Sequence, residues 1–113
     1  MNDRELLELA AKAAGMHIDD WNCDMPVMYF WDGDPQNPER NHYYWSPLTD
    51  DGDALRLAVK LGADVCIDGN QVAVYGNHDG PPPIETGPDA SANARRAITR
   101  AAAEIGRRMQ HEH

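Results

Sequence analysis

Cysteine is scarce in this chain. Its 113 residues include two, Cys23 and Cys66, and neither belongs to a CxxC pattern. The five histidines are scattered over unrelated segments without an HxxxH spacing, so the sequence offers no ligand set typical of zinc. We also expect no secretory signal, and we therefore predict two reduced thiols in a cytosolic protein.

Positive charge is scarce as well. Ten Lys and Arg stand against nineteen Asp and Glu, which gives a formal net charge of −9. This balance opposes simple electrostatic attraction to nucleic acid or to an anionic membrane. No apolar run approaches the roughly twenty residues that a membrane span needs. We therefore expect no direct nucleic-acid binding and no membrane association, and a partner that is basic or neutral.

Signatures of catalysis and of cofactor binding are missing. The chain has no GxSxG, Walker or GxGxxG motif. Two acidic clusters superficially resemble a calcium loop, but the twelfth position counted from Asp32 is Tyr43, and counted from Asp51 it is Gly62. A bidentate Glu is required there. We predict no catalytic residues, no metal and no cofactor, and hence a protein that is not an enzyme.

Helical spacing of apolar residues, aromatic strand-like runs and Pro/Gly-rich connections divide the chain into seven main elements. We expect a helix at 2–14, a loop at 16–26 with room for a short strand, strands at 27–31 and 42–45, a helix at 50–61, strands at 63–67 and 71–75, and a helix from about 89 to 108. The order α-β-β-α-β-β-α predicts a single α+β domain spanning 1–113, with one antiparallel sheet of about four strands and three helices.

The connections follow from composition. The loop at 32–41 and the crossover at 76–89 are rich in Pro, Gly and Asx residues. We predict that both are mobile, that the crossover has no regular structure, and that the tail at 110–113 is frayed.

The helix expected at 50–61 is the centre of this scheme. Apolar side chains cover most of its circumference and leave Asp53, Arg56 and Lys60 as one narrow polar stripe. This pattern predicts a helix packed on more than one side, ended by Gly62 in the left-handed conformation.

The two strands that follow this helix are typical of a hairpin. A two-residue turn, at 68–69 or at 69–70, puts the apolar residues of both strands on one face. Cys66, Ala73 and Tyr75 then share the other face.

Aromatic residues and arginines form one candidate binding surface. Trp31, Tyr43 and Trp45 lie on two strands expected to pair, where they serve either as core or as a recognition surface. The final helix carries five arginines, and Arg95 and Arg96 are the two we single out. Rings and guanidinium groups placed side by side would hold a nucleotide or a small phosphorylated signal, which makes these five residues the predicted ligand site.

Carboxylates form a second candidate surface. We predict that Asp32, Asp34, Asp50 and Asp51 contact a partner protein with a basic surface. Mimicry of DNA is one form of this hypothesis, and it requires carboxylates arranged in rows. A homodimer is a further option, since a second copy of the chain could bury the apolar faces of the helix at 50–61 and of the alanine-lined final helix.

Three segments carry a family resemblance. They read RELLELAAKAAG, YWSPLTDDGDALRLAVKLG and ARRAITRAAAEIGRRM, and in this order and spacing they resemble a group of short uncharacterised proteins of tailed phages and prophages, distantly like the NinX-type phage proteins. The likeness covers most of the chain outside 16–41 and 76–89. It implies a phage-encoded accessory protein made in the cytoplasm of the infected or lysogenic bacterial host. No active site is assigned to this group, so the resemblance implies no catalytic residues.

Three functional hypotheses follow. The first is a binding protein that inhibits a host or anti-phage defence protein. The second is a sponge that sequesters a nucleotide-derived signalling molecule. The third is a hydrolase built on His78 and Asp79, an adjacent base and acid on the 76–89 loop.

Overall fold

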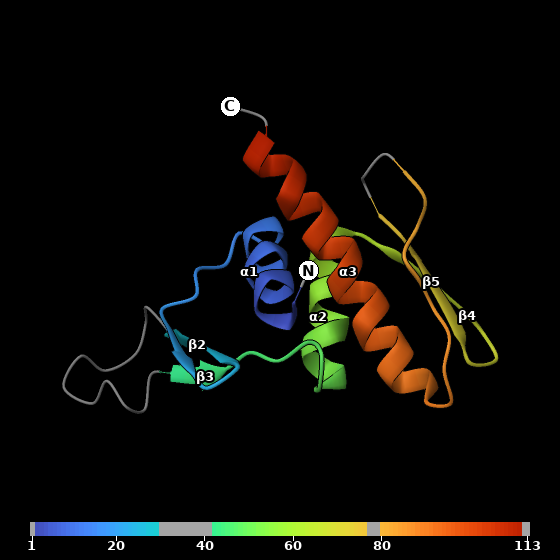
Figure 1. Ribbon diagram of the computed structural model, residues 1–113, viewed down its shortest axis with the longest axis horizontal. Coiled ribbons are helices and arrows are strands. Elements are labelled where there is room, and N and C mark those ends of the chain that lie inside the picture. The colour runs from blue at the N-terminus through green and yellow to red at the C-terminus, as the bar shows by residue number, and fades with distance from the viewer. Residues whose placement is uncertain (1, 30–41, 77–79, 112–113) are drawn as a thin grey trace.

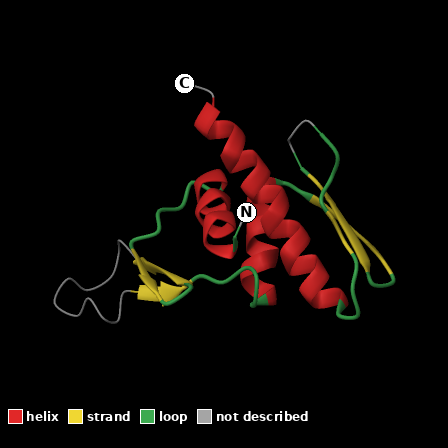
Figure 2. Ribbon diagram, viewed as in Figure 1, coloured by secondary structure: helices red, strands yellow, loops and turns green. Residues whose placement is uncertain are grey.

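Three helices lie between two small antiparallel sheets in the computed structural model, which describes residues 2–29, 42–76 and 80–111 (Figure 1). The elements are α1 (Asp3–Ala13), β1 (Asp20–Asn22), β2 (Met25–Tyr29), β3 (His42–Tyr44), α2 (Asp51–Leu61), β4 (Asp64–Asp68), β5 (Gln71–Tyr75), β6 (Ile84–Glu85) and α3 (Ala90–His111). Figure 2 shows the helices in the middle and one sheet on each side. The predicted α+β class, the single domain and the three helices are confirmed.

The strands do not form the one sheet of about four that the sequence predicted. They form two three-stranded sheets, in the orders β1-β2-β3 and β4-β5-β6. Each predicted pair gains its third strand from the adjoining loop, since β1 pairs with β2 and β6 pairs with β5, both antiparallel. A nearby segment closes a shorter loop than a distant strand and so loses less entropy. The crossover therefore contains regular structure at Ile84–Glu85, contrary to prediction.

Local signals set the helix ends where the sequence placed them. The Asn2 side chain caps α1 by accepting from the Glu5 N–H (2.8 Å), and Asp50 caps α2 by accepting from the Asp53 N–H (2.8 Å). Gly62 ends α2 at φ 65°. Helix α3 extends to His111, past the predicted end near 108.

The β4–β5 hairpin has one of the two predicted turns. Asp68 pairs with Gln71 and Val65 with Val74, so the turn is Gly69–Asn70. The predicted loop at 32–41 lies outside the described residues, but the two strands that flank it, β2 and β3, pair antiparallel as expected.

The alanine-rich face of α3 is the hub of the fold. Ala97, Ala101 and Ala102 are fully buried, and this helix packs against α1, α2 and β5. At Gly106 the approach is so close that an added Cβ would lie 2.0 Å from the Leu9 carbonyl oxygen. The backbones of α1 and α3 are therefore in direct contact, which only glycine at this position allows.

Helix α2 is covered on one side only. Ala54, Leu57 and Ala58 are buried, whereas Leu55 is 62% exposed and Val59 is 72% exposed. The prediction that this helix is packed on more than one side is wrong. It packs against α3, and its opposite face is open to solvent.

Replacement of Gly106 by alanine tests the contact between α1 and α3. The added methyl group collides with backbone rather than with a flexible side chain, so we expect Gly106→Ala to lower the free energy of unfolding by about 1–3 kcal/mol in urea denaturation. Gly52→Ala is the matched control, because its Cβ would meet side-chain atoms of Arg56 and Asp50 rather than backbone. Alanine is the better helix former, which offsets the small shift of these side chains, so the loss of stability there should be well below that at Gly106. Equal stability of both variants would show that the two helices are farther apart.

Candidate functional site

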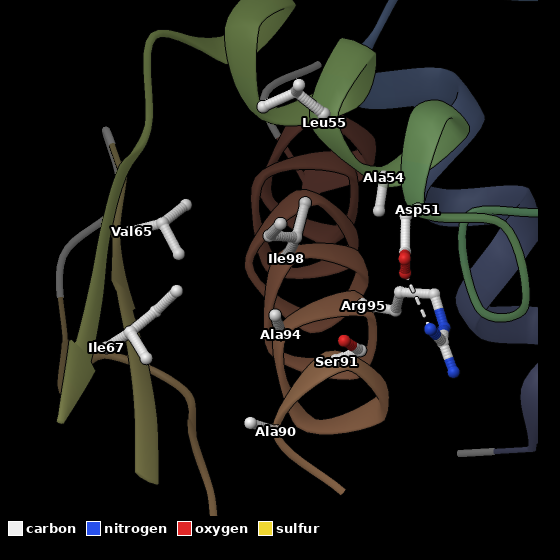
Figure 3. A pocket seen from close by; sticks show the side chains of 10 residues that line it. All are labelled: Asp51, Ala54, Leu55, Val65, Ile67, Ala90, Ser91, Ala94, Arg95 and Ile98. Atoms are coloured by element: carbon white, nitrogen blue, oxygen red, sulfur yellow. Dashed lines mark hydrogen bonds and ion pairs between the residues drawn. The ribbon is translucent and has the colours of Figure 1, made fainter. Parts of the chain in front are cut away.

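An open apolar groove runs between the β4–β5 hairpin and helices α2 and α3. Its volume is about 410 Å³, and its lining residues are Asp51, Ala54, Leu55, Val65, Ile67, Ala90, Ser91, Ala94, Arg95 and Ile98. Figure 3 shows Val65 and Ile67 pointing from β4 toward α3, with Leu55 of α2 at one end. We refer to this feature as the apolar groove.

The groove exists because α3 covers β5 and leaves β4 largely uncovered. Val72 and Val74 of β5 are fully buried beneath α3, while β4 lies at the edge of the sheet and has few contacts with that helix. Val65 and Ile67 share the face of Val72 and Val74 by the pairing register. The opposite wall on α3 consists partly of alanines, whose small side chains do not reach β4. The gap therefore remains unfilled.

Large apolar side chains at this surface meet solvent. Ile67 is 63% exposed and Leu55 62% exposed, and Val59 continues the exposed face of α2 one turn beyond Leu55. Single exposed apolar residues are ordinary, but a contiguous set beside a groove marks an interaction surface. This site was not predicted from the sequence. The one feature of the sequence that points to it is that α2 has more apolar positions than one packed side can bury.

The rim of the groove carries an ion pair. Arg95 donates from Nη1 to Asp51 Oδ1 (2.6 Å) and from Nε to the Leu48 carbonyl (3.1 Å), and its side chain is only 18% exposed. Arg95 thus joins α3 to α2 and to the turn before it. The guanidinium is the one cation among the ten lining residues, and it is already neutralised.

The structure separates the predicted ligand residues. Tyr43 and Trp45 line a second, smaller hollow of about 180 Å³ together with Arg56 and Lys60. Trp45 is 4% exposed and belongs to the core. Neither of the predicted arginines reaches this hollow.

Those arginines have other partners. Arg95 lies at the apolar groove, and Arg96 pairs with Asp3 (3.3 Å) and with Glu85 (3.7 Å). Trp31 lies outside the described residues. Of the four predicted ligand residues that the structure describes, Tyr43 and Trp45 lie together and the two arginines lie elsewhere.

The small hollow is organised by the buried carboxylate of Asp53. Asp53 accepts from the Ser46 N–H (2.9 Å) and from Arg56 Nη2 (2.6 Å), which ties the turn after β3 to the first turn of α2. Burial raises the pKa of the Tyr43 phenol above its ordinary value of 10.0, and the Asp53 carboxylate adds to that rise. The hydrogen bond to Asp53 also raises the pKa of Arg56. At neutral pH the hollow therefore holds a neutral phenol beside an ion pair.

The two predicted partner-binding carboxylates that the structure describes already have partners within the chain. Asp50 caps α2 and lies 3.8 Å from Arg56, while Asp51 pairs with Arg95 yet keeps 72% of its side chain exposed. Asp32 and Asp34 lie outside the described residues, as do His78 and Asp79.

Cys23 and Cys66 are both free, as predicted, and both are exposed. Over residues 2–29, 42–76 and 80–111, no group of three or more His, Cys, Asp or Glu side chains is arranged to hold a metal ion. Within the same described segments, no helix is both long and apolar enough to span a bilayer.

No protein-family model, curated protein or solved structure matches this chain. The phage-like resemblance therefore stays a prediction.

Substitutions in the groove separate a binding surface from a core. We expect Leu55→Gln and Ile67→Thr to change the free energy of unfolding by no more than about 0.5 kcal/mol, because both side chains are mostly in water. Leu57→Ala, on the buried side of the same helix, should cost about 2–5 kcal/mol. Urea denaturation measures all three. Losses above about 2 kcal/mol for the two groove variants would mean that these residues are buried in solution.

Proposed function

We propose that this protein acts by binding another protein through the apolar groove, and not by catalysis. The observation that carries the proposal is the exposure of Leu55, Val59 and Ile67 around a hollow of about 410 Å³. A chain of this size gains stability by burying such side chains. Leaving them in water is costly unless a partner covers them.

The lining of the groove supports binding over chemistry. Ser91 is its one hydroxyl and Asp51 its one carboxylate, and Asp51 is held by Arg95. A catalytic pocket needs a nucleophile or an acid and base within hydrogen-bond reach of each other. An apolar trough beside an exposed helix face instead resembles the centre of a protein interface.

Net charge and family resemblance narrow the class of partner. A formal charge of −9 favours a partner with a basic surface, by steering and by complementarity at the rim. The phage-like segments favour a host or anti-phage defence protein, which this chain would restrain in the bacterial cytoplasm. Asp51, exposed at the rim, is the predicted partner-binding carboxylate that such a surface would meet first.

Site-specific photo-crosslinking in bacterial lysate tests this function. With a photoreactive phenylalanine at position 55 or 67 of the full chain, we expect the same adduct from both positions. The same probe at Ile84 should give none, because Ile84 is comparably apolar and 47% exposed but lies on β6, outside the groove. The partner, identified by mass spectrometry and purified, should bind Ile67→Glu at least about tenfold more weakly than wild type.

The Ile84→Glu variant is the matched control for this affinity measurement, since it adds the same charge to the same sheet. Its affinity should equal that of wild type. Equal labelling from all three probe positions, or equal loss in both variants, would contradict a function located in the groove.

A second candidate function is sequestration of a small anionic ligand by the hollow beside Tyr43. Two rings, the Arg56–Asp53 ion pair and Lys60 line this hollow, so the lining carries a net positive charge, which favours a nucleotide-like ligand. Its volume of about 180 Å³ is below the roughly 300–1,000 Å³ of typical ligand pockets, so only part of a nucleotide would be enclosed. The cations differ from the predicted Arg95 and Arg96.

Thermal denaturation against a panel of cyclic and linear nucleotides tests this candidate. A true ligand at a hundred times its dissociation constant adds about 2.7 kcal/mol to stability. The gain should disappear in Arg56→Gln and persist in Arg96→Gln, which lies away from the hollow. A panel without any stabilising nucleotide removes the candidate.

A further inference from the structure

We propose that the occupant of the apolar groove is an amphipathic helix of another protein, with apolar residues at helical spacing on one face and Lys or Arg on its flanks. This inference rests on the proposed binding function and adds the shape and the charge of what binds. Three observations support it: the geometry of the walls, the net charge of the chain, and the position of β4 in its sheet.

The two walls of the groove are arranged so that a second helix could pack beside α3 and over β4. On α3, Ala90, Ala94 and Ile98 recur every four residues along one wall, over about 12 Å of helix axis. On β4, Val65 and Ile67 point toward this wall (Figure 3). A second helix alongside α3 would cover β4 as α3 covers β5. Small residues at two of the three wall positions permit an interaxial distance near the short end of the usual 8–10 Å.

Negative charge dominates the chain that surrounds the groove. Asp51 is the one carboxylate that lines the groove, and its side chain is 72% exposed beside its ion pair with Arg95. Asp64 and Asp68 alternate with Val65 and Ile67 on β4, so they point to the opposite face of the sheet, and Asp89 caps α3 by accepting from the Ser91 and Ala92 N–H groups. The lining thus has no unpaired cation, and the formal net charge of −9 favours lysine or arginine on the flanks of an incoming helix.

The same net charge disfavours a second copy of this chain. A symmetric dimer through the groove would bring together two molecules that each carry a formal charge of −9, and this repulsion opposes their association. A basic partner is not subject to this penalty.

The position of β4 argues against an extended peptide. β4 is an edge strand, so a peptide could add to it through main-chain hydrogen bonds. An added strand would lie in the plane of the sheet, about 4.8 Å farther from β5 and hence from the helix that covers β5. It would leave Ala90, Ala94 and Leu55 uncovered. A helix placed in the groove contacts both walls and α2.

Synthetic peptides test the inference on the full chain. The probe is a fluorescein-labelled peptide of about five helical turns, with leucines at i, i+3, i+4 and i+7 and lysines between them. One comparison peptide has the same composition in strict Leu-Lys alternation. Another keeps the helical leucine pattern but replaces lysine by glutamate. Fluorescence anisotropy at physiological ionic strength measures affinity, and circular dichroism measures the helix formed on mixing.

We expect the helical lysine peptide to bind wild type and Ile84→Glu equally, with a gain of helical signal. Ile67→Glu should weaken its binding at least about tenfold. Both variants add one negative charge, which by itself favours a basic peptide, so a loss confined to Ile67→Glu reports the groove rather than net charge. The alternating and glutamate peptides should each bind at least about tenfold more weakly than the helical lysine peptide.

Other outcomes overturn the inference in distinguishable ways. Tighter binding of the alternating peptide, sensitive to Ile67→Glu, would identify an added strand and leave the groove as the binding site. Equal affinity of the glutamate peptide would refute the basic partner. Light scattering that shows a dimer of wild type but a monomer of Ile67→Glu would identify a second copy as the occupant. If Ile67→Glu weakens the binding of no peptide but crosslinking from positions 55 and 67 succeeds, only the helix inference is refuted. If that crosslinking fails as well, the proposed function is refuted together with it.

Discussion

The direct backbone contact between α1 and α3 at Gly106 is the constraint on which the rest of the structure depends. Because an added Cβ would lie 2.0 Å from the Leu9 carbonyl, these two helices can approach this closely only with glycine at that point. The buried alanines of α3, including Ala97 and Ala101, extend the same principle to its other neighbours. Small residues let α1, α2 and β5 surround one helix without large side chains between them. The fold is therefore held by short interhelical distances rather than by a few bulky core residues.

The position of α3 also creates the groove. A helix with its side chains is about 10 Å wide and strands are about 4.8 Å apart, so one helix covers roughly two strands of a sheet. Here α3 packs on β5 and β6, which leaves β4 without a covering helix. Ile67 on β4 and Leu55 on α2 border the uncovered space and stay in contact with water. The formal net charge of −9 produces a repulsion between copies of the chain that opposes their association through such a surface.

Charged residues that looked like binding groups in the sequence have structural contacts as well. Asp50 caps α2, and Asp53 accepts from the Ser46 N–H and from Arg56. Arg95 joins α3 to Asp51 and to the Leu48 carbonyl. Sequence patterns identify such side chains as polar and available, but ion pairs between distant segments depend on how the elements pack. This is why the predicted ligand set was dispersed, with Tyr43 and Trp45 at one hollow and the arginines elsewhere.

The sequence by itself determined the features that depend on a few neighbouring residues. These are the left-handed stop at Gly62, a two-residue hairpin turn at 68–69 or 69–70, which the structure places at Gly69–Asn70, and the order of the three helices. Short-range sterics and hydrogen bonds fix such features wherever the segment is placed. Tertiary structure alone decided that the strands form two sheets, that β6 joins β5, and that one apolar face of α2 stays in water. Those outcomes depend on which surfaces, far apart in the chain, pack against one another. A periodic apolar pattern predicts that a helix face will be buried, but it does not tell whether the burying surface belongs to the same molecule or to another one.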